Sequence, residues 1–132
     1  MEEFRRIKRE LVAKGAIIDY YQDTMQIPNG NIAKWDLIDH KGAAAVVAVR
    51  EDGKLLMVRQ YRNALDRETL EIPAGSRDST EEATSVCAAR ELEEETGYRA
   101  AKMELLITVS TTVAFCNETI DVYLATELTP TQ

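Results

Sequence analysis

The sequence is poor in the residues that build disulfide frameworks and structural zinc sites. Its 132 residues include two cysteines, one histidine, one tryptophan and three prolines. Cys87 and Cys116 lie far apart in the sequence and lack CxxC or Cys/His spacing, which argues against a zinc site. The first residues form no apolar stretch that would direct secretion. We therefore expect a cytoplasmic protein in which both cysteines are free thiols.

Long apolar runs and an excess of basic residues are also absent. No window approaches the roughly 20 uncharged apolar residues that a membrane span requires. The 23 acidic residues outnumber the 16 basic ones, which gives a formal net charge of −7. An acidic chain does not suit binding to nucleic-acid backbones, but carboxylates also hold divalent cations that in turn bind phosphates. We expect a small-molecule ligand, with neither nucleic acid nor membrane as a partner.

Residues 1–41 are expected to form an N-terminal region that precedes the main domain. Apolar residues at i, i+3 and i+7 predict a short amphipathic helix over residues 4–12. Residues 17–27 and 33–38 have the composition of strands, and Pro28-Asn29-Gly30 between them is a turn signal. This pattern predicts an antiparallel strand pair.

Residues 42–132 are expected to form one α+β domain. The apolar run 42–50 predicts a buried strand, and after a turn at Asp52-Gly53 residues 55–61 should return beside it. Residues 63–68 are predicted as a loop and 69–72 as a short strand. Two further strands are expected at residues 103–112 and 118–126. With one long helix between them, these strands predict an α+β sandwich.

The clearest helix is predicted over residues 79–96. Ser79 is expected to cap it, with Glu82 closing a capping box, and Gly97 to end it. On this helix Glu91, Glu94 and Glu95 fall within one sector.

Carboxylates four residues apart on a helix repel one another. A hard divalent cation such as Mg²⁺ or Mn²⁺ would relieve that repulsion, because it prefers oxygen ligands. Glu93 points nearly opposite, toward solvent. The alternative interpretation of these acidic residues is an ordinary solvated helix face.

The stretch from Gly75 to Tyr98 resembles the Nudix box, G-x5-E-x7-R-E-U-x-E-E-x-G-U, where U is a bulky apolar residue. The matching positions are Glu82, Arg90, Glu91, Leu92, Glu94, Glu95, Gly97 and Tyr98. Six residues rather than five separate Gly75 from Glu82. We interpret this as one extra loop residue; the alternative is that Glu81 takes the place of Glu82.

The resemblance implies two or more Mg²⁺ or Mn²⁺ ions. Their expected ligands are Glu91, Glu95, Glu94 and a backbone carbonyl at Gly75. It also implies an internal ion pair between Arg90 and Glu82 that orients helix and loop. The catalytic set implied is Glu118, Glu94 and Arg90, with Glu118 as the general base that deprotonates a water.

Three further segments resemble the ADP-ribose pyrophosphatase subfamily of Nudix hydrolases. They are residues 25–43, the VRQYR and LEIPAG stretches at 58–62 and 70–75, and residues 114–118. The resemblance implies an α/β/α sandwich with a mixed central sheet, and a homodimer formed through the N-terminal strands. Because a Nudix fold closes with another helix, which is absent here, we expect that a C-terminal segment is missing from this chain.

The activity implied is metal-dependent hydrolysis of ADP-ribose, or a similar nucleoside diphosphate sugar, to AMP and ribose 5-phosphate. One alternative is a Nudix hydrolase of GDP-mannose, another nucleotide sugar or a dinucleotide. The other is a non-catalytic domain that binds a nucleotide.

Two arginines are candidates for substrate binding. Arg62 offers a guanidinium fork to a phosphate, and Arg59, three residues away on the same strand, is the second choice. Glu71 would either join the metal ligands or be a surface charge.

Trp35 is the candidate for stacking the adenine, with a role in the core or in a dimer interface as its alternative. Tyr20 or Tyr21 could serve instead of Trp35. His40 is expected to be structural, because the sequence offers it no evident partner.

Overall fold

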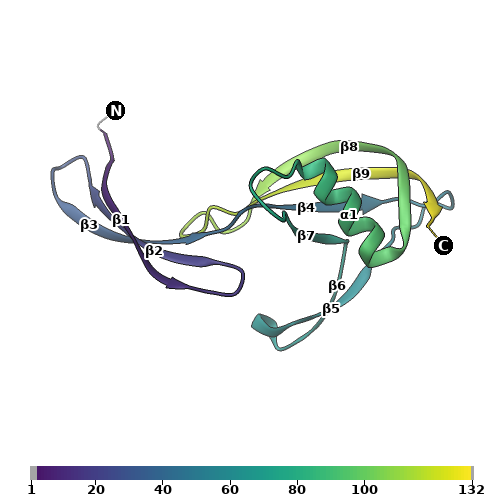
Figure 1. Cartoon of the computed structure of the whole chain (residues 1–132), viewed down its shortest axis with the longest axis horizontal. Coiled ribbons are helices and arrows are strands. Elements are labelled where there is room, and N and C mark those ends of the chain that lie inside the picture. Colours follow the sequence, from purple (N-terminus) through teal and green to yellow (C-terminus); the bar gives the residue numbers. More distant parts are fainter. Residues whose placement is uncertain (1–2, 132) are drawn as a thin grey trace. The chain divides into compact units, whose positions relative to one another are not determined.

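The computed structural model describes residues 3–131, which form two compact units. Unit 1 comprises Met1–His40 and Ser110–Glu118, and unit 2 comprises Lys41–Val109 and Thr119–Gln132. Each unit has its own sheet, labelled in Figure 1.

Unit 1 is built on a three-stranded antiparallel sheet in the order β1-β2-β3. Its strands are β1 (Arg5–Lys14), β2 (Asp19–Gln26) and β3 (Ile32–Asp39). The strand pair β2–β3 confirms the pattern predicted for residues 17–38.

The predicted helix over residues 4–12 is wrong, because these residues form most of β1. The register between β1 and β2 shifts at Ile7 and again at Val12. Each shift is a β-bulge, which breaks the strict apolar–polar alternation of a strand. Because of the two bulges, the sequence of β1 does not show the two-residue period that identifies a strand. Pairing with β2 decides the structure, reinforced by two hydrogen bonds of 2.7 and 2.8 Å from Arg9 to the buried Asp23.

Unit 2 contains a four-stranded sheet in the order β7-β4-β9-β8. Its strands are β4 (Ala43–Ala48), β7 (Ala74–Ser76), β8 (Tyr98–Ser110) and β9 (Thr119–Pro130). Strand β4 runs antiparallel to β7 and parallel to β9, so the sheet is mixed. One α-helix, α1 (Thr84–Thr96), packs against it (Figure 1). The predicted α+β class and mixed sheet are confirmed.

A separate two-stranded sheet belongs to the same unit. Strands β5 (Val58–Arg62) and β6 (Arg67–Glu71) pair antiparallel around the 3₁₀ turn η1 (Asn63–Leu65). The predicted return of residues 55–61 beside β4 is therefore wrong beyond its first residues. The segment forms a bridge at Val49–Leu55, with hydrogen bonds from Leu56 N–H to Ala48 O and from Arg50 N–H to Lys54 O. Both edges of β4 are already paired, with β7 and β9, which leaves no room for β5.

Helix α1 begins five residues later than predicted. Its N-cap is Ala83, which provides no side-chain hydrogen bond, so the predicted capping box is wrong. The Glu82 carboxylate instead accepts the backbone N–H of Asp78 at 2.9 Å and binds Arg90. The predicted C-terminus is confirmed, because Gly97 has a φ of 75° and donates to Glu93 O.

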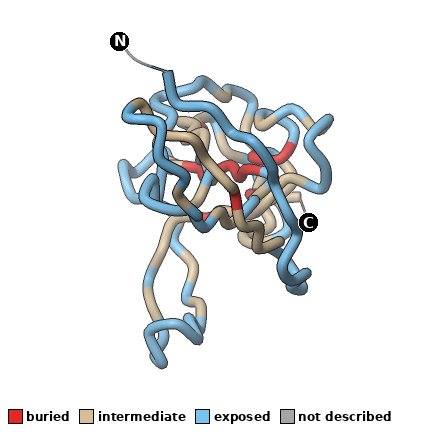
Figure 2. Tube along the Cα trace, turned by 90° about the vertical axis from the view of Figure 1, so that its left-hand side faces the viewer, coloured by how far each residue is buried: buried red, intermediate tan, exposed pale blue. Residues whose placement is uncertain are grey.

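The core of unit 2 is made of small residues. Its fully buried members are Ala44, Val46, Ala48, Cys87, Ala88, Leu92 and Ala125. Buried residues are coloured red in Figure 2. The alanines let α1 approach β4 closely, which fixes the helix on the sheet.

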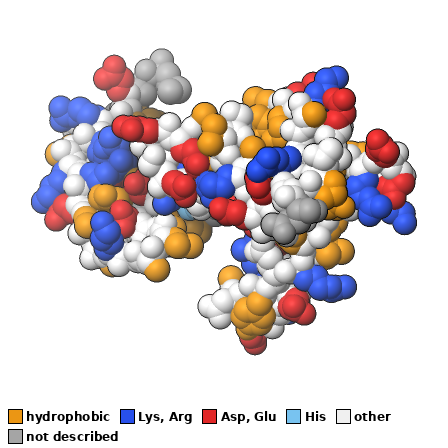
Figure 3. Space-filling view, turned by 45° about the vertical axis from the view of Figure 1, so that its right-hand side comes forward, with side chains coloured by type: hydrophobic (Ala, Val, Ile, Leu, Met, Phe, Trp, Pro, Cys, Tyr) orange, Lys and Arg blue, Asp and Glu red, His pale blue; other side chains and the backbone are white. Residues whose placement is uncertain are grey.

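Many hydrophobic side chains remain on the surface, as the orange patches of Figure 3 show. No helix within residues 3–131 is long and apolar enough to cross a membrane. Over the same residues α1 is the sole α-helix.

Candidate active site

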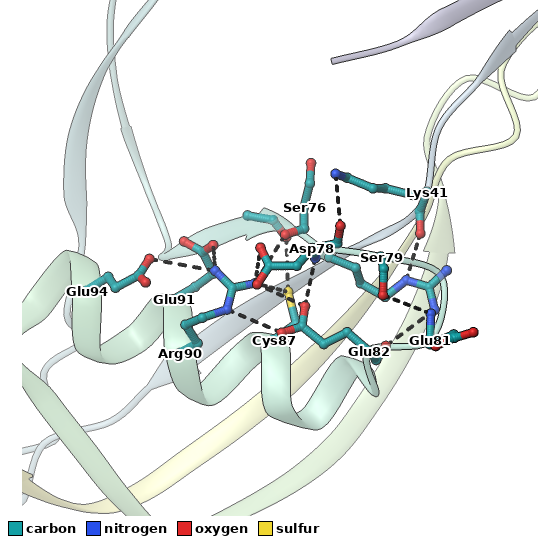
Figure 4. Close-up of polar contacts among 12 residues, drawn as sticks. Lys41, Ser76, Asp78, Ser79, Glu81, Glu82, Cys87, Arg90, Glu91 and Glu94 are labelled. Carbon is teal, nitrogen blue, oxygen red and sulfur yellow. Dashed lines mark hydrogen bonds and ion pairs between the residues drawn. The ribbon is translucent and has the colours of Figure 1, made fainter. Parts of the chain in front are cut away.

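Arg90 joins the loop before α1 to the helix itself (Figure 4). Its Nη2 lies 3.0 Å from Oε1 of Glu82 and 3.5 Å from Oδ1 of Asp78, and its Nη1 lies 2.9 Å from Oε1 of Glu91. The hydrogen bond from Arg90 is the main reason that the pKa of Glu82 lies below its usual range. The structure therefore contains the Arg90–Glu82 ion pair that the sequence implied, and adds Asp78, which the sequence analysis did not identify.

Glu91 lies directly against β7. A Cβ atom added at Gly75 would overlap the carboxyl group of Glu91, so a glycine is needed for this approach. Beneath it, the buried Cys87 thiol donates to the carbonyl oxygen of Gly75 at 3.5 Å. The side chain of Glu91 is only 13% exposed. The sequence-predicted positions Gly75 and Glu91 are thus brought together.

Glu95 reaches the same strand from one turn further along α1. Its Oε2 accepts the backbone N–H of Ala74 at 3.2 Å. Burial, above all, raises the pKa of Glu95, and the nearby charges of Glu91 and Glu71 raise it further. Two carboxylates therefore face β7, and the surroundings of Glu95 disfavour its negative charge, as expected of a ligand that a cation completes.

The remaining glutamates of α1 differ from this pair. The Glu94 side chain is 59% exposed, and its Oε2 lies 3.7 Å from Arg90. Glu93 forms an ion pair of 3.1 Å with Arg99, away from β7. Glu93 is therefore the acidic residue of the helix that takes no part in the site.

The donor atoms along β7 suit a hard divalent cation. Carboxylate oxygens of Glu91 and Glu95 and the carbonyl oxygen of Gly75 are ligands that Mg²⁺ and Mn²⁺ prefer. Among residues 3–131, no three His, Cys, Asp or Glu side chains are gathered closely enough to hold a metal by themselves. The Glu91 carboxylate is bound by Arg90 instead.

Arg62 is held by a carboxylate in the β5–β6 sheet. Its Nε and Nη2 donate to the two oxygens of Glu71 at 2.7 and 2.5 Å, and the Thr69 hydroxyl also donates to Glu71. These donors, Arg62 first, lower the pKa of Glu71 to about 2. Glu71 is thus engaged by Arg62, a partner that the sequence did not indicate. Arg59 lies exposed on β5, opposite Leu70.

Trp35 lies on β3 in unit 1. Its ring centroid is 6.0 Å from that of Phe4, and the residue is 43% exposed. It lines a cavity of about 760 Å³ together with neighbouring residues of β3 and with residues 113–117. An exposed indole beside an open cavity is available to a flat aromatic ligand.

Glu118 also belongs to unit 1, whereas the α1 glutamates belong to unit 2. Its Oε2 lies 3.3 Å from Nε2 of His40, and its Oε1 accepts the Thr111 hydroxyl at 2.9 Å. The expectation that His40 has no evident partner is wrong. No local sequence signal could have revealed the contact, because nearly eighty residues separate the two side chains.

The chain belongs to the Nudix family. The family model of the NUDIX domain matches residues 39–130, which include the loop, β7 and α1.

Characterised relatives share the sequence over most of this chain. It is 42% identical over 126 residues to an ADP-ribose pyrophosphatase of Bacillus subtilis (strain 168), covering 96% of this chain and 68% of that protein. It is 41% identical to a methanol dehydrogenase activator of Bacillus methanolicus, covering 93% and 66%. It is 38% identical to an ADP-ribose pyrophosphatase of Mycobacterium tuberculosis, covering 96% and 61%. The chain thus spans about two thirds of the length of these relatives.

A solved structure has the same fold. It is the crystal structure of an ADP compounds hydrolase, with a TM-score of 0.85 and 21% sequence identity, covering 98% of this chain and 70% of that one.

Proposed function

We propose that this chain hydrolyses the diphosphate of ADP-ribose, or of a similar nucleoside diphosphate sugar, to AMP and ribose 5-phosphate. The observation that carries the proposal is the pair of carboxylates, Glu91 and Glu95, held against β7 within a Nudix box. The 38–42% identity to ADP-ribose pyrophosphatases supports this choice of substrate.

The proposed metal ligands are Glu91, Glu95, Glu94 and the carbonyl of Gly75, holding two or more Mg²⁺ or Mn²⁺ ions. Such ions neutralise phosphate charge and lower the pKa of bound water. Arg90 fixes Glu91 and the loop in place through its ion pairs.

Outside the box, the proposal gives three residues direct roles. Arg62, already held in a fixed orientation by Glu71, presents its guanidinium to a phosphate, with Arg59 as the second choice. Glu118 accepts a proton from the attacking water. Trp35 stacks on the adenine at the cavity that it lines.

We also propose a homodimer formed through residues 1–41 and a cytoplasmic location. The whole length of β1 is exposed, including Ile7 and Leu11, which supports the dimer. Sedimentation of the purified protein tests it, and a monomer at micromolar concentration would contradict it.

The central experiment is a substrate panel with metal titration. Purified protein is given ADP-ribose, GDP-mannose or a nucleoside triphosphate, each with Mg²⁺ or Mn²⁺, and released AMP or phosphate is measured. We expect ADP-ribose to have the highest kcat/KM. Faster turnover of a triphosphate would overturn the choice of substrate.

A pair of variants tests the metal site. Glu95→Gln should abolish hydrolysis and leave some nucleotide binding, because the neutral amide cannot replace a carboxylate ligand. Glu93→Gln is the matched control, since Glu93 lies on the same helix and pairs with Arg99. Activity that survives in Glu95→Gln would exclude this metal site.

A further inference from the structure

The loop between β8 and β9 is tied to the end of β3. Ile38 N–H donates to Phe115 O at 2.6 Å, and Asn117 N–H donates back to Ile38 O at 3.3 Å. The Asn117 side chain accepts the backbone N–H of His40 at 2.8 Å and donates to Asp39 at 2.7 Å. Four hydrogen bonds therefore fix the segment that leads into Glu118.

Both oxygens of the Glu118 carboxylate have a partner on this scaffold. Oε1 accepts the Thr111 hydroxyl at 2.9 Å, and Oε2 lies 3.3 Å from Nε2 of His40. The side chain of His40 is 10% exposed and that of Glu118 is 24% exposed. The carboxylate is thus held from two sides but remains accessible to solvent.

We infer that His40 and Thr111 are positioning residues for Glu118. The inference rests on the proposed function, in which Glu118 is the general base. Thr111 donates to one oxygen, and Nε2 of His40, when it carries a proton, faces the other. Each carboxylate oxygen has two lone pairs, so these two contacts restrict rotation and leave a lone pair free on each oxygen. The carboxylate is therefore ready to accept a proton without first being ordered.

The step that this arrangement serves is hydrolysis of the diphosphate. The water oxygen bonds to one phosphorus while its proton passes to Glu118. The bond from that phosphorus to the bridging oxygen breaks, and the bridging oxygen leaves on the other phosphate. His40 and Thr111 act through Glu118 and do not contact the substrate.

A double-mutant cycle on the full chain tests the inference, with kcat and KM for ADP-ribose measured for each variant. Glu118→Gln should lower kcat by about 100-fold or more. His40→Ala should lower kcat by about tenfold with KM unchanged, since a misplaced base weakens the chemical step. The double variant should be no slower than Glu118→Gln, because His40 acts only through that carboxylate.

Conservative replacement separates positioning from folding. His40→Gln should recover most of kcat, because its amide N–H can donate to the carboxylate. Thr111→Val keeps the side-chain shape and should lower kcat, with KM unchanged, as His40→Ala does. If His40→Ala fails to fold, Thr111→Val provides the test in its place. Glu104→Gln is the control, since it changes an exposed side chain on β8 that has no role in the proposed site or dimer, and it should leave kcat unchanged.

The outcomes distinguish this inference from the proposed function. Full activity in Glu118→Gln would overturn both the role of Glu118 and this inference, but not the metal site. If the decreases in kcat caused by His40→Ala and Glu118→Gln multiply in the double variant, the inference alone is overturned. Unchanged kcat in both His40→Ala and Thr111→Val would also overturn only the inference. An inactive wild-type chain on ADP-ribose, with another substrate turned over, would overturn the choice of substrate.

Discussion

The Thr84 hydroxyl at the start of α1 donates a hydrogen bond of 2.6 Å to Oδ2 of Asp121 on β9. The other oxygen, Oδ1, accepts the Thr108 hydroxyl, also at 2.6 Å. The Tyr123 hydroxyl lies 2.7 Å from Thr84, and since Thr84 has a single proton, Tyr123 must be the donor there. These bonds join the N-terminus of α1, which has no side-chain cap, to the sheet.

Asp121→Asn should lower the free energy of unfolding at pH 7 by about 1–2 kcal/mol, since one of the two hydroxyl donors loses a charged acceptor. Hydrogen bonds from Thr108 and then Thr84 hold the pKa of Asp121 below its ordinary value of 3.8. A lowered folded-state pKa gives stability that is present above the unfolded-state pKa and is lost as the pH falls through the folded-state pKa.

The difference between wild type and Asp121→Asn should therefore shrink below about pH 4. Urea unfolding at pH 7 and pH 3 measures this difference. Glu104→Gln, an exposed site on β8, is the control. Equal destabilisation at both pH values would contradict the assigned cause.

Gly75→Ala should weaken Mn²⁺ binding at least tenfold, because the added methyl group displaces the carboxyl of Glu91. Calorimetric titration with Mn²⁺ measures the affinity without requiring a substrate. Gly53→Asn is the control: no atom lies within 4 Å of the new Cβ, and asparagine tolerates a positive φ. Unchanged Mn²⁺ affinity in Gly75→Ala would show that Glu91 is not a ligand.

Arg62→Lys should raise KM for the diphosphate substrate by about tenfold or more, because lysine cannot reproduce the bidentate fork. Arg67→Lys, on the neighbouring strand β6 and exposed, is the control. Steady-state kinetics with both variants measures the effect. If KM stays the same and only stability falls, Arg62 serves Glu71 rather than the phosphate.

Leu92→Ala should lower the free energy of unfolding by about 2–5 kcal/mol. Leu92 is fully buried between α1 and the sheet, so its truncation leaves a cavity. Leu106→Ala, half-exposed on β8, should cost less than 1 kcal/mol by the usual scale of surface substitutions. Chemical denaturation compares them, and equal losses would be inconsistent with the core described above.

The family, the fold class and the end of α1 could be predicted from the sequence, because each depends on local spacing. The box residues recur at helical intervals, and Gly97 marks a backbone conformation that few residues adopt. The residues proposed for metal and substrate binding are predictions that the variants above test.

Pairings between distant segments could not be predicted. Two bulges interrupt the apolar–polar alternation of β1, so its sequence does not predict a strand. Strand β4 is paired on both edges, so β5 pairs with β6 instead. The contact of His40 with Glu118 likewise depends on tertiary packing, and that of Arg62 with Glu71 depends on the pairing of β5 with β6. Neither has a spacing that local propensity could reveal.

The parallel pairing of β4 with β9 constrains how the polypeptide folds during synthesis. Ala43 lies opposite Ile120, so the centre of the sheet closes over a loop that contains most of the chain. Such non-local pairing is slow and must wait until the later strand leaves the ribosome. Until then the apolar segment Ala43–Ala48 lacks one of its two neighbours. The nascent chain is therefore at its most aggregation-prone just before β9 emerges, and a chaperone that shields that edge would raise the yield of folded protein.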